Sequence, residues 1–359
     1  MPASLRQSQA TDNQAMKNPI SRHSLIAAAA IASAGGVAAQ SSVTIYGAIG
    51  LDVVSASKVY NATTGQSKSQ LLIEDNAIVN SRIGFKGAED LGGGLKAVFD
   101  LESSINPDTG RSRGTQFWNR GAYVGLEGGF GSIKFGQQWD VADDYFGNYM
   151  VFAYYSPFFF DGFYSLSNYY SNAIKYNSPN IGGFQGGLYY ALGEVPGKST
   201  AGRFFQGVAT YTTGPFSIGL AVDSLKDSAG SGDTDDMWAL GASYDFGVAK
   251  ARVMYARSDD EITTVSRSPF KAGLIDLGVD VPLGAFSLSG DFVKKDVKDS
   301  PNDTQYFRFR GGYALSKRTS LNANVIFLKN SGAANFVWYG AGKAGQKQNI
   351  FTFGITHSF

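Results

Sequence analysis

Residues with the chemistry of catalysis are scarce in this chain of 359 residues. Cysteine is absent, which excludes a thiolate nucleophile, a thiolate metal site and a disulfide framework. Of the two histidines, His23 lies in an apolar leader and His357 lies at an apolar position near the end of the chain. Hydrolases of the Ser-His or Asp-His type need a histidine that titrates near neutral pH. The sequence therefore argues against an enzyme, and it contains no motif for a cofactor or a metal.

Charged side chains recur instead at every second position of apolar segments. In residues 81–87, Arg82 and Lys86 alternate with Ile83 and Phe85. An Arg or Lys at the midplane of a lipid-facing strand costs about 2–4 kcal/mol, whereas a water-filled lumen tolerates it. We therefore predict an aqueous lumen lined with charge, in which most single residues form the wall without setting selectivity. By the same parity, the inward-facing charges include Lys96, Asp100, Lys134, Lys175, Lys250, Arg252, Asp276, Asp280, Asp291, Arg308 and Arg310.

The stretch 139–170 is the longest interval without a clear strand pattern, and it is rich in aromatic residues and aspartates. A loop longer than about 15 residues is usually functional or disordered, and disordered segments are poor in aromatics. We therefore predict an ordered constriction loop, residues 139–170, that folds into the lumen. With residues of the wall, the predicted pore constriction consists of Arg82, Lys86, Arg120, Lys134, Asp140, Asp143, Asp144, Phe158, Phe159, Asp161, Arg308 and Arg310.

Strands must position these side chains, and segments of about ten residues with period-two alternation recur from 43–53 to 349–359. Tight turns such as 213–215 alternate with long polar connections such as 226–235. This spacing predicts an all-β fold, a 16-stranded antiparallel transmembrane β-barrel with an inward-folded constriction loop. A soluble β-sandwich or propeller also alternates, but it would not need charges on the second face of most strands.

The N-terminal residues 1–39 are predicted to be a secretory signal peptide, so that the barrel occupies residues 40–359. The apolar run 25–34 is too short to span a bilayer, basic residues precede it, and small residues at 37–39 provide a cleavage site. Met16 is a second candidate for the start of the chain. The formal net charge is +1, so charge gives no argument for a nucleic-acid partner.

Several short motifs occur in a fixed order along the chain. They are Val43-Thr44-Ile45-Tyr46-Gly47, residues 81–91 with the turn Gly92-Gly93-Gly94, residues 120–126, residues 131–136, residues 172–179, residues 313–319 and residues 354–359. Together they resemble the trimeric Gram-negative porins, in the beta-proteobacterial general porin branch. The resemblance implies sixteen strands, a homotrimer and passive diffusion of ions and small hydrophilic solutes. It also implies a place in the bacterial outer membrane, in contact with lipid and lipopolysaccharide.

The resemblance further implies a basic cluster on the barrel wall that faces an acidic or polar third loop. Arg82 matches one position of this cluster and Arg120 a second, although its parity with Val124 points Arg120 outward unless a bulge intervenes. The terminal Phe359, which shares its parity with Phe351, resembles the signal that the outer-membrane assembly machinery recognises. A final strand that merely closes the barrel would carry the same residues.

Two positions depart from the family pattern. Tyr169 stands where an arginine is usual, and Gly136-Gln137-Gln138 replaces Gly-Arg-Gln. Fewer wall arginines argue against strong anion selectivity. We hypothesise a narrower constriction, lined with rings, that favours small aromatic or amphipathic solutes; the alternative is that these rings only pack the loop against the wall. An adhesin or purely structural barrel is a third class, which an absence of ion-conducting pores would favour.

Overall fold

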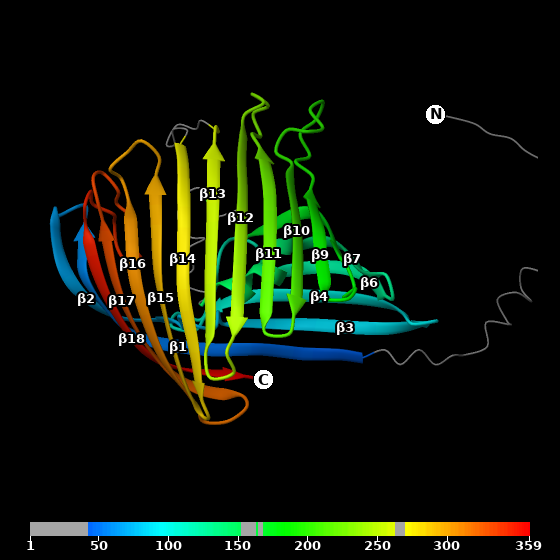
Figure 1. Cartoon of the computed structure of the whole chain (residues 1–359), viewed down its shortest axis with the longest axis horizontal. Coiled ribbons are helices and arrows are strands. Elements are labelled where there is room, and N and C mark those ends of the chain that lie inside the picture. Colours follow the sequence, from blue (N-terminus) through cyan, green and yellow to red (C-terminus); the bar gives the residue numbers. More distant parts are fainter. Residues whose placement is uncertain (1–41, 152–162, 164–167, 263–269) are drawn as a thin grey trace, which may run out of the picture. The chain divides into compact units, whose positions relative to one another are not determined.

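The computed structural model describes residues 42–151, 163, 168–262 and 270–359 (Figure 1). The predicted signal peptide and the predicted constriction residues Phe158, Phe159 and Asp161 lie outside the described residues. Among the described helices, none is long and apolar enough to cross a membrane.

The described residues form a closed antiparallel β-barrel of 16 strands, which confirms the predicted fold class. Consecutive strands pair around the ring, except that β2 and β3 both pair with β1 and that β4 pairs with β6; β1 closes the ring by pairing with β18. The strands are β1 (Ser42–Asn61), β2 (Gln66–Asp75), β3 (Arg82–Gly92), β4 (Leu95–Asn106), β5 (Arg111–Ser112), β6 (Gly121–Gly128), β7 (Gly131–Trp139), β8 (Tyr169–Asn177), β9 (Phe184–Ala191), β10 (Phe204–Thr213), β11 (Phe216–Lys226), β12 (Thr234–Asp245), β13 (Lys250–Asp260), β14 (Phe270–Leu283), β15 (Phe286–Val297), β16 (Thr304–Ala314), β17 (Thr319–Asn330) and β18 (Lys347–Ser358).

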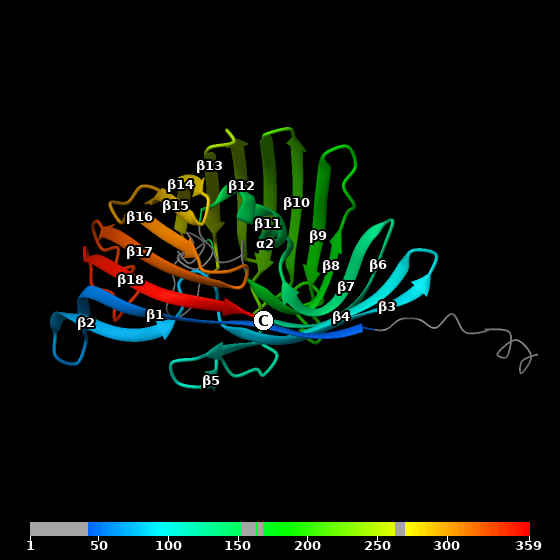
Figure 2. The ribbon, with the colours of Figure 1, turned by 90° about the horizontal axis from the view of Figure 1, so that it is seen from below.

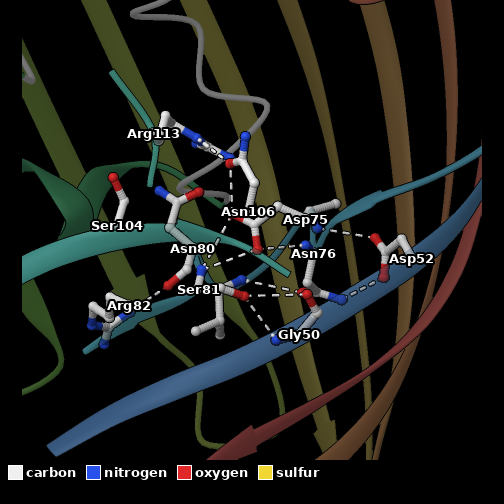
Figure 3. Close-up of polar contacts among 12 residues, drawn as sticks. Gly50, Asp52, Asp75, Asn76, Asn80, Ser81, Arg82, Ser104, Asn106 and Arg113 are labelled. Carbon is white, nitrogen blue, oxygen red and sulfur yellow. Dashed lines mark hydrogen bonds and ion pairs between the residues drawn. The ribbon is translucent and has the colours of Figure 1, made fainter. Parts of the chain in front are cut away.

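β2 and β3 pair with successive parts of β1, so together they form one barrel strand that is interrupted at residues 76–81 (Figure 3). The interruption removes sheet partners from Gly50, and the Ser81 hydroxyl replaces them. The hydroxyl oxygen accepts a bond from the Gly50 amide at 2.9 Å, and the hydroxyl O–H donates one to the Gly50 carbonyl at 3.2 Å. The carboxylate of Asp52 accepts a bond from the Asn76 side chain. The break is therefore a hydrogen-bonded bulge rather than a defect. The two-residue β5 pairs only with the end of β4 and is not part of the ring.

The alternation of apolar and polar residues in the sequence corresponds to the outer and inner faces of the barrel wall. On β1 the apolar Ile45, Ile49 and Val53 are exposed, whereas Ala48 and Asp52 on the other parity are buried. Large apolar side chains are exposed in the same way on nearly every strand, as a lipid-facing surface requires.

The inward face is less polar than strict alternation predicts. Around β12–β18 the inward positions include a band of buried apolar side chains in place of charges. They are Met237, Met254, Leu274, Val293, Tyr306, Ile326, Leu328 and Ile350. This band, together with the first part of the loop between β7 and β8, forms the hydrophobic core inside the barrel.

The loop between β7 and β8 begins with the helix α2 (Val141–Phe146) and the 3-10 turn η1 (Gly147–Tyr149). Figure 2 shows α2 within the ring of strands, and it contacts β8, β9, β10 and β11. Its apolar residues Val141 and Phe146 are completely buried. We call residues 141–151 the arm.

Candidate pore-lining site

Two arginines of the inner wall share one carboxylate. Arg82 begins β3, Glu102 lies on β4 and Arg120 directly precedes β6. The Nε atom of Arg82 lies 3.2 Å from one oxygen of Glu102, and Arg120 donates a hydrogen bond to the other oxygen. The side chains of Arg120 and Glu102 are 11% and 12% exposed, respectively, so the contact is largely shielded from bulk water. With two guanidinium groups against one carboxylate, this part of the wall retains a positive charge.

Arg120 points into the barrel although strict alternation with Val124 would turn it outward. The strand β6 begins only at Gly121, so the pleat does not fix the direction of the Arg120 side chain. Its guanidinium carbon lies 5.5 Å from the centre of the Trp139 ring and 5.7 Å from that of Tyr169. The two rings are 3.6 Å apart between centres. Tyr169, which replaces the arginine that the resemblance implies, therefore supports Arg120 in this chain.

Two lysines of the predicted constriction lie on the same wall, and each has an anionic or aromatic neighbour. Lys86 Nζ lies 4.9 Å from the centre of the Tyr46 ring, and the Tyr46 hydroxyl donates bonds of 2.9 and 3.0 Å to Asp100. Lys134 Nζ lies 3.1 Å from an oxygen of Glu127. We call the inward faces of β3, β4, β6, β7 and β8 the charged wall.

Asp144 joins α2 to the charged wall. One of its oxygens lies 2.9 Å from Lys175 Nζ and accepts a bond of 2.7 Å from the Asn177 side chain, both on β8. The Lys175 side chain is only 7% exposed, so bulk water screens this ion pair little. Asp144 therefore brings a loop carboxylate into contact with a basic wall residue.

Asp140 has a different position, because it is fully buried and caps α2. Its two carboxylate oxygens accept bonds from the amides of Asp143 at 2.9 Å and Asn168 at 2.8 Å, which ties the two ends of the loop together. Burial, reinforced by the neighbouring Asp143 carboxylate, raises the pKa of Asp140 well above its usual range. Asp143 precedes Asp144 on the exposed side of the same short helix.

These groups surround a cavity of about 240 Å³ inside the barrel. Three basic and three acidic side chains face it, so its formal charge is balanced although its walls are strongly polar. Small hydrated ions and solutes of either sign find a partner here, while no group is arranged for covalent chemistry. The lining consists of Tyr46, Asp100, Glu102, Arg120, Gly121, Tyr123, Lys134, Gln138, Trp139, Asp144, Lys175 and Asn177.

Arg308 and Arg310 belong to another part of the ring, on β16. Arg308 is 1% exposed and binds both oxygens of Asp291 on β15, with 2.8 Å from Nε to Oδ1. Neither arginine lines the cavity of the charged wall. The structure thus brings Arg120, Lys134 and Asp144 together and separates them from the two arginines of β16.

Some lining residues were missed at the sequence level. Glu102 has the same parity as Asp100, so the alternation of β4 was sufficient to place it inward. Gln138 carried no comparable signal, and Trp139 entered the prediction only as the first residue of the constriction loop, because both lie where the strand ends and the loop begins. Their position depends on how the chain leaves the sheet.

Comparisons with known proteins agree with this architecture. Residues 26–333 match the Gram-negative porin family. The chain is 33% identical to outer membrane porin protein 32 of Delftia acidovorans, over 94% of this chain and 100% of that protein. It is 31% identical to an outer membrane porin of Bordetella pertussis, over 86% and 94%.

A solved structure gives the same result. The anion-selective porin from Comamonas acidovorans superimposes with a TM-score of 0.78 at 30% identity, covering 89% of this chain and 100% of that one. The closed barrel, its apolar exterior and the similarity to these porins lead to the same conclusion. The chain belongs to the Gram-negative porin family and is a protein of the bacterial outer membrane.

Proposed function

We propose that this chain forms a water-filled channel for the passive diffusion of ions and small hydrophilic solutes across the outer membrane. The observation that carries the proposal is the segregation of side chains by the barrel wall. Apolar residues such as Ile45 and Phe353 are exposed outside, whereas Arg120, Lys134 and Asp144 meet at a polar cavity inside. Among the described residues that line the cavity, the charged groups pair with one another, as in the wall of a polar channel.

The constriction of this channel lies between the charged wall and the start of the loop 139–170. Asp144 of the arm reaches Lys175, which narrows the space on this side of the lumen. Phe158, Phe159 and Asp161 of the proposed constriction lie outside the described residues. Asp140 contributes by holding the ends of the loop together rather than by facing solutes.

Ion selectivity follows from how the wall charges are compensated. The relative from Comamonas acidovorans is described as anion-selective. Here Arg82 and Arg120 share Glu102, and Lys175 is paired with Asp144. We infer a weak preference for anions, set by the single positive charge that Glu102 leaves over.

Planar-bilayer recordings of the purified protein test this function directly. We expect stepwise increases in current, and under a salt gradient a reversal potential displaced slightly toward the anion potential. Protein that has been heat-denatured in detergent serves as the control for adventitious conductance. Folded protein that inserts without conducting would support the adhesin or structural alternative.

A second candidate function is selectivity for small aromatic or amphipathic solutes. It is favoured by the Trp139–Tyr169 ring pair beside the Arg120 guanidinium, which offers a planar surface and a cation at one edge of the cavity. We expect benzoate to interrupt the current of the native channel more often than acetate does. The Tyr169→Ser variant should lose that difference, and equal block by the two anions in the native channel would rule this candidate out.

We also propose a homotrimer. β2 pairs with β1 along one edge, and among the described strands none pairs with its other edge. Leu71 and Ile73 of β2 are 74% and 56% exposed. An open strand edge is not tolerated in hydrocarbon, so contact with another protomer would cover it. Leu71→Asp should weaken the oligomer seen on gels of unheated samples, compared with Leu283→Asp at a tight turn on β14.

The remaining proposed partners are outer-membrane lipid, lipopolysaccharide and the assembly machinery. Phe359 is 43% exposed, and its backbone bonds to Gly47 in both directions, at 3.2 and 3.1 Å. An exposed terminal ring is available to a recognition partner before the barrel closes. Deletion of Phe359 should slow insertion in cells, whereas unassisted refolding into detergent should be less affected.

A further inference from the structure

The arm rests against the wall opposite the charged side, where two glycines face each other. Gly219 on β11 and Gly241 on β12 are directly paired across the two strands, and both point inward. The Tyr149 ring lies over them and is 1% exposed. A Cβ at Gly219 would lie 2.6 Å from the ring, and a Cβ at Gly241 would overlap it as well. Glycine is thus required at both positions because the ring needs the space.

A hydrogen bond fixes the ring in this position. The Tyr149 hydroxyl lies 2.9 Å from Ser217 Oγ, which lies one inward position before Gly219 on the same strand. Phe146 of α2 packs edge-on against the ring, with 5.3 Å between the centres. Ring, hydroxyl and neighbouring aromatic together leave Tyr149 one orientation.

The two ends of the arm are held in the same manner. Val141 lies against Gly187 of β9, and Val151 lies against Gly278 of β14, where an added Cβ would overlap either valine. Between them the Arg252 side chain of β13 donates a bond of 2.6 Å to the backbone carbonyl of residue 148. The arm is therefore fitted into glycine gaps from β9 to β14, and we call these inward faces the socket wall.

We propose that Gly219 and Gly241 form a socket for Tyr149, and that this socket sets the distance of the arm from the barrel wall and thereby the width of the lumen. This inference rests on the proposed channel function and adds the residues that position the constriction. A side chain in the socket would displace the arm toward the lumen axis, because the rigid ring cannot bend away.

Single-channel conductance of Gly241→Ala tests the socket. We expect a loss of conductance relative to the native channel, and a smaller loss for Gly219→Ala. Gly311→Ala on β16 is the matched control, since a Cβ there meets nothing within 4 Å. Tyr149→Phe, which keeps the ring, should conduct like the native channel. Tyr149→Ala should change the conductance, because the arm then lacks the ring that packs over Gly219 and Gly241.

The double variant Gly241→Ala/Tyr149→Ala distinguishes the socket from a general effect on the strand. If the socket is correct, removal of the ring abolishes the effect of Gly241→Ala, so the double variant matches Tyr149→Ala. If Gly241→Ala fails to fold, recovery of folding in the double variant supports the socket, and failure of both overturns it. Equal conductance of Gly241→Ala, Gly311→Ala and native protein also overturns it.

The outcome is separable from that of the proposed function. Native protein that does not conduct removes the channel function, whereas conducting native protein with unaffected socket variants removes only the socket. The temperature at which the folded barrel unfolds, seen as the loss of its compact mobility on gels, provides a second readout. This temperature should fall for Gly241→Ala and recover in the double variant, whether or not the protein conducts.

Discussion

The charged wall and the socket wall are built from the same alternating strands, yet they hold the loop by different physics. On the charged wall, Asp144 of α2 meets Lys175 through a 2.9 Å ion pair. On the socket wall, the Tyr149 ring fills the space left by two glycines. Charge contacts have long range and depend on salt, whereas steric contacts have short range and do not. One wall is therefore suited to select ions, and the other to fix the position of the loop.

The role of the charged wall is tested most strongly by Glu102→Gln, which leaves two arginines without their shared carboxylate. Removal of one unit charge about 4 Å from an ion changes its energy by roughly 1 kcal/mol in water, or about fivefold in permeability ratio. We expect the anion-to-cation permeability ratio, calculated from the reversal potential under a salt gradient, to rise by about fivefold. Glu89→Gln at the exposed end of β3 is the control. Identical ratios for both variants would mean that the charged wall does not select.

Ionic strength should separate the two walls. The Debye length falls from about 10 Å at 0.1 M to about 3 Å at 1 M salt. The difference between Glu102→Gln and native protein is therefore expected to shrink at high salt, as measured by reversal potentials at a fixed concentration ratio. The conductance loss of Gly241→Ala should persist in proportion. If the conductance loss of Gly241→Ala also vanished at high salt, the socket wall would not act by steric contact.

Asp140 lies where the loop leaves the charged wall, and its cap should contribute to stability. We expect Asp140→Ala to lower the free energy of unfolding in urea by about 1–2 kcal/mol, because two loop amides lose their acceptor. Asn retains a cap, so Asp140→Asn should be much closer to the native protein. Asp143→Asn, which alters charge without removing the cap, is a suitable control.

The pH dependence of the same variants follows from the raised pKa of Asp140. A raised folded-state pKa means that the folded protein favours protonated Asp140. The stability gained in this way is present below the ordinary aspartate pKa and is lost as the pH rises through the raised value. Asp140→Asn imitates the protonated form. Its stability relative to native protein should therefore improve from acid to neutral pH, and a constant difference would refute the burial argument.

The smallest effect is expected for Ser217→Ala on the socket wall. It removes the partner of the Tyr149 hydroxyl, a neutral hydrogen bond that contributes about 0.5–1.5 kcal/mol. Urea unfolding should show this loss, while the reversal potential stays unchanged. A shift in ion selectivity would show that the socket wall also contributes to the field in the lumen.

Much of the fold follows from local patterns in the chain. Alternation over about ten residues, as in β14 and β16, places one face in lipid and the other inside, and this needs no knowledge of distant contacts. The break at residues 76–81 was not predictable in this way, because it depends on Ser81 and Asn76 bonding to a different strand, β1. β2 itself was missed for the same reason: its register is set by β1.

The site was predictable only in part. Arg82, Lys86 and Lys134 lie on the charged wall, where parity places them, whereas Arg120 escapes parity because it precedes its strand. Arg308 and Arg310 have the correct parity, but Arg308 pairs with Asp291 on the neighbouring β15 and neither arginine lines the cavity. Parity fixes the face of a residue, but it cannot give its angle around the barrel.

The alternation, the number of strands and the sign of the charges that face inward follow from the amino-acid sequence alone, because each depends on residues close together in the chain. The pairing of these charges and the position of the loop in the lumen, by contrast, depend on contacts between residues far apart in the chain. Glu102 contacts Arg82 of β3 and Arg120, which precedes β6, and the Tyr149 ring fills a gap left by glycines about 70 and 90 residues further along the chain. These long-range contacts depend on the geometry of the closed barrel, which cannot be derived from any short segment of the sequence.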